Sequence, residues 1–239
     1  MAGKSILEIL REQMEIRLPG QLYHATQIDM AYNSNRIEGS TLSHEETRYI
    51  YETRSIIDSP KVNVDDVIET SNHFILFNYM LKTADQALTE EMIKMYHQIL
   101  KSGTKDAMLD WLNVGEYKTL ANTIGGIVET TEPADVSKQI KTLLEAYHAK
   151  ESPALKDIVD FHWKFERIHP FQDGNGRVGR MIIFKECLAN DIMPFVVLDA
   201  DKAFYYKGLQ EYPDGTRLLD TCLHFQDLYR EKVKKFFPD

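Results

Sequence analysis

Residues 169–180 read HPFQDGNGRVGR, and this stretch decides how the middle of the chain must fold. Pro170 pushes the residue before it out of the helical region, so a helix that arrives from about residue 153 should end near His169. The glycines of DGNG favour a tight loop, so we expect the next helix to begin no earlier than Gly176. The stretch therefore predicts a helix, a short polar loop and a second helix.

The loop has the composition of an anion site. The first N–H groups of a helix lack partners within it, and the helix dipole favours negative charge there. Glycines let a phosphate approach the backbone, Asn175 adds an amide donor, and Arg177 and Arg180 project from one side of the new helix. Asp173 would repel phosphate unless a divalent cation bridges the two, and Mg²⁺ prefers such an oxygen ligand. His169, at the opposite end of the loop, can take a proton near neutral pH.

Helical signals dominate the rest of the chain. Ser5 with Glu8, and Ser43 with Glu46, have the spacing of a capping box, which predicts helices at about 5–17 and 44–56. The segment from Met181 to Leu188 is apolar on most sides, as in a helix buried at the centre of a domain. Apolar periodicity predicts the other helices: one that ends near Ile37 before Gly39, and others at about 63–82, 89–102, 133–149, 153–168, 199–211 and 215–237.

One stretch has the composition of strands. Residues 119–133 read TLANTIGGIVETTEP, with Thr, Ile and Val around Gly125 and Gly126, which suits a short β-hairpin better than a helix. We therefore predict an all-α fold with one small β-hairpin. The N-terminal helices, residues 1–59, form one expected region, and residues 60–239 form the main domain.

Composition and charge exclude several classes of protein. The chain has 239 residues, of which 43% are hydrophobic, so it can bury a sizeable core. A formal net charge of −9 argues against a broad basic surface for nucleic acid. Only two cysteines are present, with no CxxC pair, so neither a disulfide framework nor a cysteine-rich zinc site is expected. No apolar run reaches the length of a membrane span or resembles a signal peptide, so we expect a cytoplasmic protein with no membrane partner.

The loop stretch closely resembles the signature of the Fic family, HxFx(D/E)GNGRxxR. Every specified position matches, namely His169, Phe171, Asp173, Gly174, Asn175, Gly176, Arg177 and Arg180. The resemblance implies an α-helical domain with a β-hairpin flap. It extends to GEYK at 115–118 and to the flap region Ile124, Gly125, Gly126 and Ile127. Tyr205 and Tyr206 lie where family members have tyrosines near the adenine.

Most Fic enzymes transfer AMP from ATP to a Ser, Thr or Tyr hydroxyl of a protein. The resemblance implies that His169 is the general base and that Asp173 holds Mg²⁺ against the phosphates. It implies that Asn175 and the glycine N–H groups stabilise the α-phosphate, while Arg177 and Arg180 bind the β- and γ-phosphates. The implied cofactors are ATP and Mg²⁺. The implied partner is a protein that pairs with the flap edge and presents a hydroxyl.

A second motif lies upstream. Residues 34–39 read SNRIEG and match the family's inhibitory signature (S/T)xxxE(G/N), and on a helix Ser34 and Glu38 share one face. The resemblance implies that Glu38 pairs with Arg180, so that ATP binds in an unproductive pose. In some family members this glutamate also supports removal of AMP. The sequence leaves that activity open, along with homo-oligomer formation.

Three alternatives accompany this interpretation. Glu145 with His148, and Glu166 with His169, have the Glu-x-x-His spacing of di-iron carboxylate bundles, but Pro170 ends the second helix at its own ligand. Relatives of the Fic enzymes transfer UMP, phosphocholine or phosphate instead of AMP. A catalytically silent binding protein could keep the same fold, although the intact His169 and both arginines argue against it.

Overall fold

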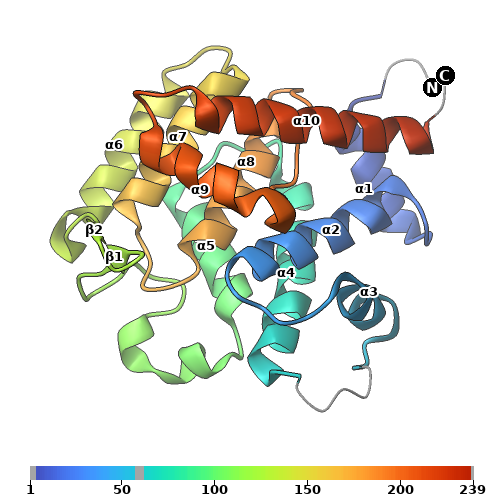
Figure 1. Ribbon diagram of the computed structural model, residues 1–239, viewed down its shortest axis with the longest axis horizontal. Coiled ribbons are helices and arrows are strands. Elements are labelled where there is room, and N and C mark those ends of the chain that lie inside the picture. The colour runs from blue at the N-terminus through green and yellow to red at the C-terminus, as the bar shows by residue number, and fades with distance from the viewer. Residues whose placement is uncertain (1–3, 57–61, 238–239) are drawn as a thin grey trace.

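The structure is a computed structural model, and it describes residues 4–56 and 62–237. Helices account for most of this part of the chain, and a single two-stranded hairpin accompanies them (Figure 1). The predicted all-α fold with one small hairpin is therefore confirmed. The helices are α1 (Ile6–Ile16), α2 (Leu22–Ile37), α3 (His44–Thr53), α4 (Val64–Thr83), α5 (Glu90–Lys101), α6 (Val136–His148), α7 (Leu155–Ile168), α8 (Asn175–Ala189), α9 (Lys202–Glu211) and α10 (Arg217–Phe236).

The predicted helix boundaries agree closely with the structure, because their signals are local. Both capping boxes form, with Ser5 before α1 and Ser43 before α3. The helices expected at 133–149 and 199–211 each begin with a short 3₁₀ turn, η3 (Pro133–Asp135) and η4 (Asp199–Asp201). Two more 3₁₀ turns, η1 (Lys105–Met108) and η2 (Asp110–Leu112), were not predicted.

Helix α8 lies at the centre of the fold, as its apolar sequence predicts. Helices α1, α2, α4, α5 and α7 all pack against it (Figure 1). Met181, Phe184 and Cys187 are fully buried along its length. Dense packing on most sides fixes the axis of α8 and therefore fixes the direction in which its N-terminus points.

The helix starts one residue earlier than expected. Gly174 takes a φ of 81°, in the left-handed region, and serves as the N-cap, so α8 begins at Asn175 and not at Gly176. The preceding helix, α7, ends as predicted, because His169 also takes a left-handed φ of 52° before Pro170.

The hairpin consists of β1 (Thr123–Ile124) and β2 (Val128–Glu129), paired antiparallel with Ile124 opposite Val128. Gly125 and Gly126 both have positive φ, at 60° and 75°, which glycine adopts without steric cost. Ile127 follows them and is 87% exposed. The flap therefore presents an apolar side chain at its tip.

None of the helices in residues 4–56 and 62–237 has the length and apolar character needed to cross a membrane.

Candidate active site

His169 closes α7 and is partly buried at the entrance of the loop. Its Nδ1 lies 3.3 Å from the carbonyl oxygen of Glu166. A carbonyl can only accept, so this contact favours the tautomer with the proton on Nδ1 and leaves the Nε2 lone pair available. Burial lowers the pKa of His169 below its usual value, the Glu166 carbonyl opposes this shift, and the charge of Lys118 reinforces it. The imidazole is therefore neutral at neutral pH and able to accept a proton.

The loop after His169 is held closed by Asn175. Its Oδ1 accepts from the Phe171 N–H at 2.8 Å, and its Nδ2 donates to the Phe171 carbonyl at 2.8 Å. The Phe171 ring stacks on His97, with ring centroids 4.0 Å apart. Asn175 was predicted to donate its amide to a phosphate. The structure gives it a different contact, because both of its polar atoms bond the backbone of the loop.

The first turn of α8 faces a carboxylate. A Cβ built on Gly176 would lie 2.3 Å from Oε1 of Glu38 and 2.9 Å from Nη1 of Arg180, so no other residue fits there without a shift. Glu38 follows directly after α2 and lies against the helix N-terminus that was predicted to hold an anion. A carboxylate at such an N-terminus is favoured by the helix dipole.

Arg180 is bound by the two residues of the upstream motif. Its Nη2 donates to Oε1 of Glu38 at 2.7 Å and to the carbonyl of Ser34 at 3.0 Å, and its Nε donates to Oγ of Ser34 at 3.0 Å. Burial would lower the pKa of Arg180, but the charge of Glu38 outweighs burial and raises it. The structure thus brings Ser34, Glu38 and Arg180 together, as the motif predicts.

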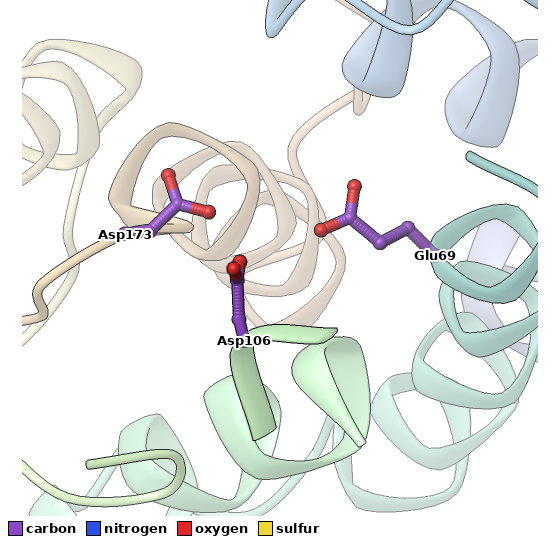
Figure 2. Close-up of side chains that lie close together, drawn as sticks. All are labelled: Glu69, Asp106 and Asp173. Atoms are coloured by element: carbon purple, nitrogen blue, oxygen red, sulfur yellow. The ribbon is translucent and has the colours of Figure 1, made fainter. Parts of the chain in front are cut away.

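A second group of charges surrounds Asp173 (Figure 2). The carboxylates of Glu69, Asp106 and Asp173 come from α4, η1 and the loop, and one oxygen of each lies within 4.8 Å of the others. The ammonium of Lys101 lies among them, 2.5 Å from Glu69, 2.5 Å from Asp106 and 2.7 Å from Asp173. Arg177 pairs with Glu69 and, at 3.0 Å, with Asp173. Two buried cations therefore offset most of the negative charge of the three carboxylates.

Asp173 remains suited to hold a metal ion. Lys101 and Arg177 both contact its Oδ2, and its side chain is 49% exposed, so a cation can reach the carboxylate from solvent. Burial would raise the pKa of Asp173, but Arg177 and Lys101 outweigh burial and hold it well below its usual value. An ionised carboxylate oxygen is the kind of ligand that Mg²⁺ prefers.

Glu166 is a residue that sequence reasoning did not place in this site except as a di-iron ligand. Its Oε1 is buried without a hydrogen-bond partner in the described part of the chain and lies where a Cβ on Gly179 would meet it, at 2.4 Å. Burial raises the pKa of Glu166 to about 8, the charge of Arg180 opposes this, and that of Glu38 adds to it. The carboxyl is therefore mostly protonated at neutral pH.

The di-iron alternative does not match the structure. Glu145 and His148 are both exposed on α6, and neither belongs to the one cluster of metal-ligating side chains found among the described residues. That cluster is the group around Asp173.

The two tyrosines predicted near the adenine point in different directions. Tyr205 is 1% exposed, and its hydroxyl contacts Nε2 of His162 at 2.5 Å. Tyr206 is 41% exposed, and its hydroxyl donates to the carbonyl of Ile37 at 3.4 Å. The ring of Tyr205 therefore lies in the core and that of Tyr206 at the surface, and the position of the two rings near the adenine stays a prediction.

Glu69, Lys101 and Asp106 were missed by sequence reasoning. They lie outside any motif, and charged residues on helices are ordinarily solvated, so no signal in the sequence separates them from surface residues.

Comparison with known proteins agrees with the fold and the motif. Residues 87–186 match the model of the Fic/DOC family. The protein adenylyltransferase Fic of Nematostella vectensis is 25% identical over 190 residues, which cover 77% of this chain and 43% of that protein. The protein of the same name from Aedes aegypti is 25% identical over 193 residues, which cover 79% of this chain and 37% of that protein. The chain thus spans less than half the length of these curated relatives.

Solved structures share the whole fold. A Fic domain containing signaling protein from Bacteroides thetaiotaomicron superimposes with a TM-score of 0.77 and 20% identity, covering 96% of this chain and 95% of that one. A Fic family protein from Desulfovibrio desulfuricans gives a TM-score of 0.73 and 22% identity, covering 96% of this chain and 72% of that one. The matched segment of residues 87–186 includes His169, Asp173 and both arginines. Residues 87–186 of this chain therefore resemble a Fic/DOC domain in sequence, and the chain shares the fold of solved Fic proteins.

Proposed function

We propose that the protein is an autoinhibited, Mg²⁺- and ATP-dependent protein adenylyltransferase. It would transfer AMP to a Ser, Thr or Tyr hydroxyl of a target protein and to itself. The proposal rests on what lies at the two ends of the loop. A neutral His169 lies at one end, and the carboxylate of Glu38 lies against the N-terminus of α8 at the other. The relatives named as protein adenylyltransferases support the same chemistry.

The reaction needs one base and a cradle for phosphates. Nε2 of His169 takes the proton of the target hydroxyl, whose oxygen forms a bond to the α-phosphorus. The bond from that phosphorus to the oxygen bridging to the β-phosphate breaks, and pyrophosphate leaves. The N–H groups at the start of α8 stabilise the negative charge that develops on the α-phosphate. Catalysis thus rests on position and electrostatics, as in phosphoryl transfer generally.

The remaining charged residues hold the leaving group. Asp173 is the residue of this chain that would bind Mg²⁺, which supplies positive charge to the phosphates when it is bound. Arg180 would bind the γ-phosphate and Arg177 the β-phosphate. Asn175 keeps the loop closed through the Phe171 backbone.

The contact between Glu38 and Arg180 supports the proposed autoinhibition. Glu38 engages Arg180 and lies against Gly176, so the γ-phosphate must displace it. To hold a population 99:1 in the inhibited state requires only about 2.7 kcal/mol, within reach of a charged hydrogen-bonded pair. The N-terminal region of residues 1–59 would then serve as the regulatory part of the chain.

The test is incubation with α-labelled ATP and Mg²⁺. We expect weak self-labelling of the wild type, strong labelling of Glu38→Gly, and none of the double variant Glu38→Gly/His169→Ala. Glu15→Gly, at an exposed position of α1, is the matched control and should label like the wild type.

Other outcomes would reject parts of the proposal. Transfer of label from γ-labelled ATP alone would replace adenylyl transfer with a kinase reaction. Equal labelling of wild type and Glu38→Gly would reject the inhibitory role while leaving the activity. The labelled protein also tests for AMP removal, which would be assigned to Glu38 if added wild type, but not Glu38→Gly, releases the label.

A further inference from the structure

The base of the flap, residues 118–122, forms hydrogen bonds with the backbone on both sides of His169. The Lys118 N–H donates to the carbonyl of Pro170 at 2.9 Å, and Nδ2 of Asn122 donates to the carbonyl of Phe171 at 3.1 Å. The Lys118 ammonium also lies 3.4 Å from the carbonyl of Ile168. Two flap residues therefore bind the carbonyls that precede and follow the histidine.

The ammonium of Lys118 has only neutral partners. It donates to Oδ1 of Asn122 at 2.8 Å and to Oγ1 of Thr130 at 2.6 Å, besides the Ile168 carbonyl. The residue is only 2% exposed. Burial lowers the pKa of Lys118 to about 8, although the charge of Glu132 opposes the shift. Lys118 is thus still mostly a cation at neutral pH.

A buried cation without a carboxylate partner is costly for the folded state. A neutral amide would reduce this desolvation cost, but its two N–H groups could not replace the three bonds that the ammonium makes. Its charge also lies close to His169, because the ammonium contacts the Ile168 carbonyl, which belongs to the peptide group that leads into the histidine.

We propose that Lys118 is a positioning residue that fastens the flap to the backbone around His169 and places a buried positive charge beside the imidazole. The inference deepens the proposed function, since a neutral imidazole is what a general base requires. Because target segments would pair with the flap edge, the same contacts connect target docking to the position of the base.

The charged residues near His169 have opposite effects on its protonation. Glu38, at the end of α2, and Asp173, in the loop, both favour the protonated imidazole, while Lys118 from the flap base disfavours it. The phosphates of ATP would add negative charge and favour protonation further. Among these neighbours, Lys118 is the cation that counters them.

The test is an NMR titration of the His169 imidazole in the full chain, with its signal assigned by the loss of that signal in His169→Gln. In Lys118→Gln, which keeps a donor and removes the charge, we expect the His169 midpoint to rise by roughly half a pH unit or more. In Lys118→Arg, which keeps the charge, we expect the midpoint to stay within about 0.2 of wild type. If Lys118→Gln does not fold, Lys118→Met makes the same change of charge with better apolar packing.

An unchanged midpoint in the uncharged variants would overturn the inference, whether or not the protein transfers AMP. Labelling of Glu38→Gly with α-labelled ATP tests the proposed function separately. There the pH at which labelling is half-maximal should rise with the His169 midpoint in Lys118→Gln and return in Lys118→Arg. A raised midpoint without any labelling in Glu38→Gly would reject the adenylyl transfer and keep the role of Lys118.

Discussion

Arg177 and Arg180 lie one turn apart on α8 and are both 3% exposed, yet their surroundings differ. Arg177 belongs to a network with Glu69, Asp173 and Lys101, all from the part of the chain that follows residue 61. Arg180 is held from α2, by Glu38 and by the neutral Ser34. The side chain of Glu38 is 30% exposed, whereas that of Glu69 is 14% exposed. The comparison indicates that the first arginine is fixed by the fold and that the second can exchange its partner.

The largest expected effect on stability at neutral pH is on the network of Arg177. Glu69→Gln leaves two buried cations, Arg177 and Lys101, without one of their carboxylates, so the free energy of unfolding should fall by about 3–5 kcal/mol. Urea denaturation measures this loss.

Glu38→Gln is the matched control for the second arginine. Arg180 keeps both contacts with Ser34, and the Glu38 end of the lost pair is 30% exposed, so we expect a smaller loss of about 2 kcal/mol. Equal losses in the two variants would remove the distinction between a fixed and an exchangeable arginine.

Glu166 provides a second, pH-dependent effect near Arg180. Its pKa in the folded protein is raised to about 8, above the value of 4.5 for an ordinary Glu. The contribution of Glu166 to the free energy of unfolding is therefore fully present below pH 4.5. It is lost as the pH rises towards 8, because the unfolded chain releases the proton at a lower pH than the folded protein does.

Glu166→Gln has no such proton to lose. Relative to wild type, it should gain about 1.4 kcal/mol of stability for each pH unit above 4.5, which amounts to roughly 5 kcal/mol at pH 8. Thermal or urea unfolding across this range measures the difference. A constant difference with pH would show that Glu166 is ionised in the folded protein and pairs with Arg180.

The smallest expected effect is on the pH dependence of labelling, which His169 controls. Because its pKa lies below the usual 6.5, labelling by Glu38→Gly should increase with pH up to a midpoint below about 6.5 and stay level through pH 7.5. A midpoint above 7 would mean that the base is protonated at neutral pH. Initial rates of labelling between pH 5 and pH 8 decide between the two.

The loop and its flanking helices could be predicted because their signals are local. Pro170 ends α7 and Gly174 caps α8 through their own backbone preferences, and neither effect depends on a distant residue. The hairpin was predicted in the same way from Gly125 and Gly126. The error of one residue at the start of α8 arose because Gly174, and not Asn175, supplies the cap.

Contacts between residues far apart in the sequence could be predicted only in part. Glu38 and Arg180 are 142 residues apart, and only the family resemblance indicated their pairing. Lys101 and Glu69 converge on Asp173 only after α4 and α5 pack together, so no pattern along the chain predicts them. For Tyr205 and Tyr206, neighbouring aromatic residues give no sign of which ring faces inward, and the packing of α9 decides it.

The central claim is that Glu38 and the γ-phosphate of ATP compete for Arg180. Calorimetric binding of ATP and of ADP, both with Mg²⁺, tests it most directly, with His169→Ala present throughout to prevent turnover. We expect Glu38→Gly to raise the affinity for ATP about tenfold or more, equivalent to about 1.4 kcal/mol, and the affinity for ADP clearly less, with the difference abolished by Arg180→Ala. An equal change for ATP and ADP, or no change for either, would contradict the account.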